Sequence, residues 1–98
     1  MNQHGAKALI HWQTHLAAQL AQIPDQEGFF TLLGETAETE IAQRAEALAD
    51  LKPQAEGYQE EVARLETARF MAEAEVTREL ILVDPAKPDK IAELLQLA

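Results

Sequence analysis

Cysteine and serine are both absent from the 98-residue chain. Without cysteine, neither a disulfide bond nor a thiolate metal ligand can stabilise the fold. Two common nucleophiles of covalent catalysis are therefore missing, and the four glycines form no phosphate-binding loop. We therefore expect a protein that is not an enzyme and that holds no cofactor.

Long apolar runs are also absent. No stretch of the sequence approaches the roughly 20 consecutive apolar residues that a transmembrane helix requires. The first residues lack the charged and then apolar layout of a signal peptide. We therefore expect no contact with membranes and a cytoplasmic location.

Basic residues are scarce as well. Eight Lys and Arg residues oppose 17 Asp and Glu residues, which gives a formal net charge of −9. Cations that neutralise phosphates supply most of the affinity for nucleic acids, so direct binding to DNA or RNA is not expected. The acidic residues either cover solvated helix surfaces, which is the commoner case, or attract a basic or nucleic-acid-binding protein by imitating nucleic acid.

The residues that are abundant favour helices. Ala, Glu, Gln and Leu dominate the composition, and all four are strong helix formers. Apolar residues at steps of three and four predict helices over residues 6–23, 35–51, 54–83 and 89–97. The short link at Pro53 predicts that the second and third helices fold back as an antiparallel hairpin.

These helices are expected to form one all-α domain over residues 1–98, as a coiled-coil-like small bundle of three to four helices. The helix over residues 54–83 would be roughly 43 Å long. A compact globule of this size is only about 34 Å across. The long helix therefore predicts an elongated molecule.

Two groups of apolar residues exceed what one helix face can hide. Four large apolar side chains, among them Phe29 and Phe30, fall within residues 29–33, so part of this group must contact another segment or another chain. In the third predicted helix, Phe70 and Ile81 lie on a second line away from the main apolar stripe. Contiguous exposed apolar surface usually marks a contact site, unless the first or last helix covers it. We expect a homodimer that uses these residues.

Arg69 interrupts the main apolar stripe of the same predicted helix. A polar residue at such a position can fix register or oligomeric state at some cost in stability. Alternatively, its methylenes cover the stripe while the guanidinium stays in water. On the first interpretation, Arg69 joins Phe29, Phe30, Phe70 and Ile81 as a predicted interaction residue.

The histidines of the first predicted helix offer an alternative. His11 and His15 are four residues apart, a spacing that lets two imidazoles share one metal ion. His4 lies about 10 Å away along the helix, too far to join them without a bend. A metal site would need a carboxylate from another helix or chain; otherwise the histidines form a polar, solvated face.

The end of the sequence contains a helix break followed by a restart: Asp84-Pro85-x-x-Pro88-x-x-Ile91-Ala92-x-Leu94. This stretch resembles segments of small helical proteins encoded by phages and prophages, and the resemblance implies an accessory protein of a mobile element. It transfers no functional residue.

The sequence as a whole predicts a non-catalytic protein–protein interaction or assembly module that is homo-oligomeric. Two alternatives stay open. One is a helical protein that binds a metal through His11, His15 and carboxylates, and the other is an acidic inhibitor that imitates nucleic acid.

Overall fold

The computed structural model describes residues 1–97, and the regular elements of these residues are all helical. In chain order they are α1 (Gln3–His15), α2 (Ala17–Leu20), α3 (Gln26–Asp50), α4 (Tyr58–Val76), the π-helical turn η1 (Thr77–Ile81) and α5 (Pro88–Leu95). Among these residues no strand occurs, and no helix is both long and apolar enough to cross a lipid bilayer. The prediction of an all-α fold is confirmed.

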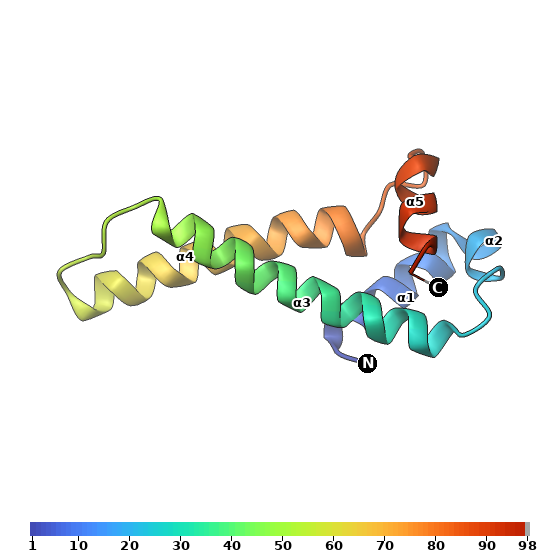
Figure 1. Ribbon diagram of the computed structural model, residues 1–98, viewed down its shortest axis with the longest axis horizontal. Coiled ribbons are helices and arrows are strands. Elements are labelled where there is room, and N and C mark those ends of the chain that lie inside the picture. Colours follow the sequence, from blue (N-terminus) through green and yellow to red (C-terminus); the bar gives the residue numbers. More distant parts are fainter. Residues whose placement is uncertain (98) are drawn as a thin grey trace.

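The molecule has a head and a protruding arm, and it measures 52 × 25 × 21 Å. We define the arm as residues 42–71, which comprise the last nine residues of α3, the connecting loop and most of α4. The other described residues form the head, where α1, α2, η1 and α5 gather around the first half of α3 (Figure 1). The loop between α3 and α4 forms the far end of the arm (Figure 1).

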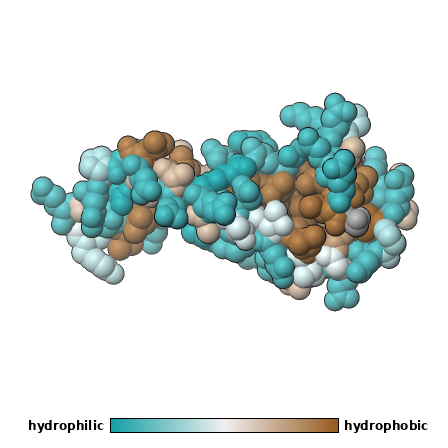
Figure 2. Space-filling model, viewed as in Figure 1, coloured by the Kyte–Doolittle hydropathy of each residue, from teal (hydrophilic) through white to brown (hydrophobic). Residues whose placement is uncertain are grey.

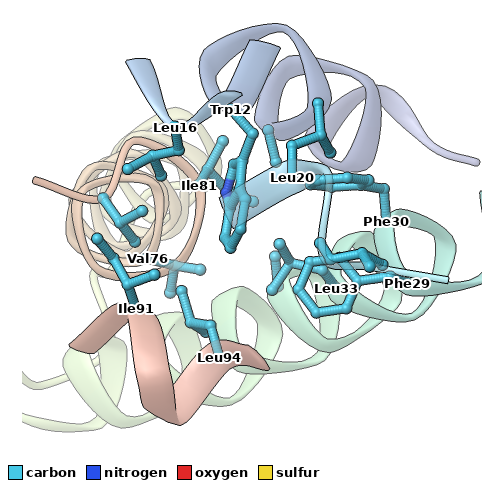
Figure 3. Close-up of a cluster of buried hydrophobic side chains, with 14 of the residues drawn as sticks. Trp12, Leu16, Leu20, Phe29, Phe30, Leu33, Val76, Ile81, Ile91 and Leu94 are labelled. Atoms are coloured by element: carbon cyan, nitrogen blue, oxygen red, sulfur yellow. The ribbon is translucent and has the colours of Figure 1, made fainter. Parts of the chain in front are cut away.

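Aromatic side chains form the centre of the head. Trp12 of α1 meets Phe29 and Phe30 of α3 edge to face, with ring centroids 5.6 Å and 5.7 Å from its own. The two phenylalanine rings also meet edge to face at 4.9 Å. Aliphatic side chains from every helical element of the head complete this buried cluster (Figure 3). The head therefore contains the hydrophobic core of the molecule.

Two glycines allow α1 to lie directly against α3. A Cβ atom added to Gly5 would overlap the carbonyl oxygen of Phe30, and one added to Gly34 would overlap the side chain of Asn2. Only glycine permits the two helices to approach this closely. Gly34 thus lies inside α3 as a contact residue, whereas the predicted helix over residues 35–51 begins only after it.

The first predicted helix, over residues 6–23, differs from the structure at both ends. α1 begins earlier, because the side chain of Asn2 caps it by accepting a hydrogen bond from the backbone N–H of Gly5 at 2.9 Å. It ends at His15, since the backbone of Leu16 leaves the helical region at φ −133° and ψ 39°. This break points the side chain of Leu16 into the core, and only the short α2 follows.

The other predicted helices are present with shifted boundaries. α3 begins nine residues before the predicted range of 35–51, because Asp25 caps it by accepting from the backbone N–H of Gly28 at 2.9 Å. α4 begins at Tyr58, so residues 51–57 form a loop where a shorter link was predicted. α5 begins one residue before and ends two residues before the predicted range of 89–97.

The π-helical turn η1 changes which side chains reach the core at the end of the long helix. The backbone N–H of Leu82 donates to the carbonyl of Thr77 at 2.7 Å, a bond across five residues that adds one residue to the turn. The three-and-four pattern predicts Leu80 as the buried residue after Val76. With the wider turn, Ile81 takes the fully buried position instead, and Leu80 is only partly buried.

Candidate functional site

Three of the five predicted interaction residues lie in the core of the single chain. Phe29 and Phe30 pack against Trp12, and Ile81 is fully buried in the same cluster (Figure 3). Phe29 and Phe30 are buried because α3 passes through the head between other helices, and Ile81 is buried because of η1. The expectation that these three side chains face a partner is corrected accordingly, and Arg69 and Phe70 remain at the surface.

Phe70 is the most conspicuous apolar side chain near the middle of α4, and 73% of its surface is exposed. It belongs to a line of residues spaced by four, three, four and three, which keeps them on one side of a helix. We call this line the outer face of α4. Its members are Ala63, Thr67, Phe70 and Ala74, which are exposed, and Thr77, the first residue of η1, which is half-buried.

The opposite side of α4 explains why the outer face stays exposed. Ala68, Ala72 and Val76 are buried there, where α4 packs along α3. The arm is only two helices thick, so each helix has one side against its neighbour and one side free (Figure 1). No other element within residues 1–97 covers Phe70. The apolar outer face is therefore a consequence of the two-helix arm.

Apolar surface is not confined to Phe70. Figure 2 shows apolar atoms on the arm, at the left, separated by hydrophilic atoms from the larger apolar area of the head. The large exposed apolar residues of the arm are Leu51, Tyr58, Leu65, Phe70 and Met71. Exposed apolar residues are ordinary when scattered singly, but their grouping on one thin element is typical of a contact surface.

Two grooves flank the outer face. The first, of about 370 Å³, lies between α3 and α4 and is lined by residues that include Leu48, Ala63, Thr67 and Met71. The second, of about 390 Å³, lies between α4 and α1 and is lined mainly by Lys7, Phe70, Glu73, Ala74, Thr77 and Arg78. Ala63 and Thr67 of the outer face thus line the first groove, and Phe70, Ala74 and Thr77 line the second.

Arg69 is engaged within the chain. Its guanidinium lies 2.7 Å from a carboxylate oxygen of Glu38 on α3 and 3.1 Å from one of Glu73 on α4. The hydrogen bond from Arg69 lowers the pKa of Glu38, and a second hydrogen bond, from His4 at 3.0 Å, acts in the same direction. Arg69 therefore joins α4 to α3, and through Glu38 to α1, in a surface network.

Two further arginines hold the arm together. Arg44 on α3 reaches Glu79 of η1 at 2.6 Å, so it connects the arm to the π-helical turn. Arg64 donates to Glu61 at 2.6 Å and also to the backbone carbonyl of Ala49. The hydrogen bond from Arg64 is the main cause that lowers the pKa of Glu61 to about 2. These arginines thus bind to acids of their own chain.

Lys7 and Arg78 differ from these three arginines. Both are exposed, both line the groove between α4 and α1, and neither makes an ion pair with any described residue. Two exposed acids of α4, Glu60 and Glu66, are likewise outside the ion pairs of the described chain. Charged groups without a partner therefore lie on both sides of Phe70.

The histidines of α1 contact different partners. His4 contacts Glu38, whereas His11 Nε2 lies 2.7 Å from the carbonyl oxygen of Val83. A carbonyl only accepts hydrogen bonds, so this nitrogen of His11 carries a proton and is not free for a metal ion. The rings of His11 and His15 lie 4.9 Å apart. Within residues 1–97, no group of three or more His, Cys, Asp or Glu side chains is arranged to hold a metal.

The sequence predicts Phe70 as an interaction residue, but it does not predict all the residues that surround Phe70. The contribution of Thr67 was readable in the sequence, because the four-and-three spacing runs without interruption from Ala63 to Thr77. Lys7 was not readable in this way, since it comes from α1 and reaches the groove only through the tertiary packing of α1 beside α4 and η1.

Comparison with known proteins adds nothing to this geometry. No protein-family model matches the chain, and neither curated proteins nor solved structures gave a match. The functional argument therefore rests on the surface itself.

Proposed function

We propose that the protein is a non-catalytic protein–protein interaction module that associates with itself through the outer face of α4. The observation that carries the proposal is the exposure of Phe70 on a line of small residues at coiled-coil spacing. A helix with this pattern is stabilised when a second helix covers the line. The coiled-coil-like character of the hairpin belongs to the same proposal.

The energetic argument concerns Phe70. Full burial of a phenylalanine side chain contributes about 1.5–3 kcal/mol. In a symmetric dimer this contribution occurs twice, because each copy presents the same surface. Met71, the residue after Phe70, is also exposed and adds to the area that a partner would cover. A partner copy would therefore remove from water the side chains that the thin arm cannot bury.

The resemblance of residues 84–94 to phage and prophage proteins fits an accessory protein without enzymatic chemistry. It remains a prediction, and it assigns no role to any residue.

The test is the oligomeric state across micromolar concentrations, measured by sedimentation velocity or by light scattering after size exclusion. We expect a species of twice the chain mass of 10.9 kDa. Phe70→Gln should return the mass to that of one chain, because the substitution places an amide where an apolar contact is required.

Leu32→Gln is the matched control, since Leu32 is exposed on α3 in the head and lies away from the outer face. It should leave the dimer intact. A wild-type mass of one chain across the whole concentration range would overturn the proposal.

A further inference from the structure

We propose that two copies pair α4 against α4 in antiparallel orientation, with the twofold axis passing beside Phe70. This inference rests on the proposed function and names its partner, a second copy of this chain, and the arrangement of the contact.

The outer face is nearly symmetric about Phe70. Ala63 precedes Phe70 by seven residues and Thr77 follows it by seven, while Thr67 and Ala74 lie three before and four after. In an antiparallel pair centred on Phe70, Ala63 of one copy faces Thr77 of the other. Small side chains then oppose small side chains along the contact. The two helices can approach closely, and the two Phe70 rings meet at the axis.

Charges on the first side of the outer face are complementary under this arrangement. Glu60 precedes Phe70 by ten residues and Arg78 follows it by eight. They are 18 residues apart, which is about five helical turns, so both lie along the same side of the helix. Antiparallel pairing places Glu60 of one copy within about two residues, or about 3 Å along the axis, of Arg78 of the other. Symmetry produces this pair twice.

The other side of the outer face is complementary as well. Glu66 lies one turn before Phe70, and Lys7 lines the groove beside Phe70 and Thr77. Pairing about Phe70 brings Glu66 of one copy toward Lys7 of the other. Glu73 lies on this side too, but its carboxylate is 3.1 Å from the guanidinium of Arg69, which compensates its charge.

Parallel pairing would lose these contacts. The twofold axis would then run along the helices, so the side with Glu60 and Arg78 would face the side with Glu66 and Lys7 of the second copy. Acid would lie nearest acid and base nearest base, which is unfavourable. The two grooves also fit the antiparallel arrangement, because it places the first groove of one copy opposite the second groove of the other, where each can receive side chains of the second copy. Charge complementarity and shape therefore favour the same partner in the same orientation.

The test is a charge exchange between Glu60 and Arg78. Glu60→Arg and Arg78→Glu should each raise the dissociation constant of the dimer about tenfold or more at low salt, since both replace two opposite-charge contacts by two like-charge contacts. An equimolar mixture of the two variants should form heterodimers of wild-type affinity, because Arg at position 60 then meets Glu at position 78. The double variant should recover its homodimer. Native mass spectrometry with one variant labelled with ¹⁵N identifies the heterodimer.

The control for the charge change is Glu35→Arg, at an exposed position of α3 in the head that makes no ion pair with a described residue. It should change the dissociation constant less than twofold, and circular dichroism should show unchanged helicity for every variant. If the wild type dimerises but the mixture forms no heterodimer, or if the single variants dimerise as the wild type does, the antiparallel arrangement is wrong while self-association stands. If the wild type is monomeric throughout, both proposals fail.

Discussion

The head and the arm are built from the same kind of helix and bury very different side chains. The head buries large residues, such as Trp12 and Phe30, which are both fully inaccessible to solvent. The buried positions of the arm are the two alanines Ala49 and Ala68, and its phenylalanine faces water. The comparison indicates that burial of large side chains in the head stabilises the fold, whereas the arm leaves its large apolar side chains exposed.

The largest expected effect comes from one substitution made in both regions. Phe30→Ala in the head should lower the free energy of unfolding by about 3–5 kcal/mol, because it leaves a cavity in the core. Phe70→Ala in the arm should change it by less than about 0.5 kcal/mol, since the ring makes little contact within the chain. Urea denaturation below the dissociation constant of the dimer measures both. Equal losses would remove the distinction between head and arm.

Glycine substitutions should also change the free energy of unfolding differently in the head and in the arm, but by a smaller amount. Alanine in place of a glycine inside a helix ordinarily stabilises it by about 1 kcal/mol. Gly34→Ala should instead destabilise the head by about 1–3 kcal/mol, because its Cβ would overlap Asn2 and displace α1.

Gly57→Ala is the counterpart at the tip of the arm. There the added Cβ meets only the carboxylate of Glu60, which can rotate away. Its effect should stay within about 0.5 kcal/mol. Thermal unfolding of the two variants checks the contrast, and a harmless Gly34→Ala would contradict the close approach of α1 to α3.

Arg69→Leu should have a modest effect of about 0.2–1 kcal/mol, because the exposed pair with Glu38 is lost. The expected sign is destabilisation with an unchanged dimer, since the partner of Arg69 lies in its own chain. Higher thermal stability together with a broader range of oligomers would instead show that Arg69 fixes the register of association. Thermal unfolding and sedimentation velocity on the same sample distinguish the two results.

The smallest expected effect concerns the pH dependence of the arm. Arg64 lowers the pKa of Glu61 from 4.5 to about 2 in the folded protein. A carboxylate with a depressed pKa contributes stability above its unfolded pKa and loses it as the pH falls toward the folded value. Wild-type protein should therefore lose more stability than Glu61→Gln between about pH 4.5 and pH 2. Melting temperatures of both proteins across this range provide the measurement, and parallel curves would contradict the assignment.

The sequence predicts the helices well where local pattern decides and poorly where packing decides. The stripe of α1 and the long helices followed from apolar spacing. The predicted second helix begins only after Gly34, because no local signal shows that α1 packs against this glycine inside α3. The end of α1 at Leu16 also depends on packing. Leaving the helical conformation there is favourable only because the Leu16 side chain becomes buried in the core.

The candidate site was predictable to a similar degree. Phe70 stands out from the sequence, because it lies off the main stripe of a long helix. Ile81 shares that property in the sequence and yet is buried, because η1 inserts one residue between the two positions. Lys7 enters the site only through the packing of α1 beside the long helix, which no spacing rule reports.

The π-helical turn also determines the direction in which the arm points. Ile81 is held in the core and Phe70 lies eleven residues earlier on the same helix, with the additional residue of η1 between them. Deletion of one residue from this turn would restore regular α-helical geometry. If Ile81 kept its place, the preceding helix would have to rotate about its axis by about 100°, the turn made by one residue. The number of residues in this turn therefore sets the orientation of the outer face relative to the head. A change of one residue would turn the same face toward a partner in a different position.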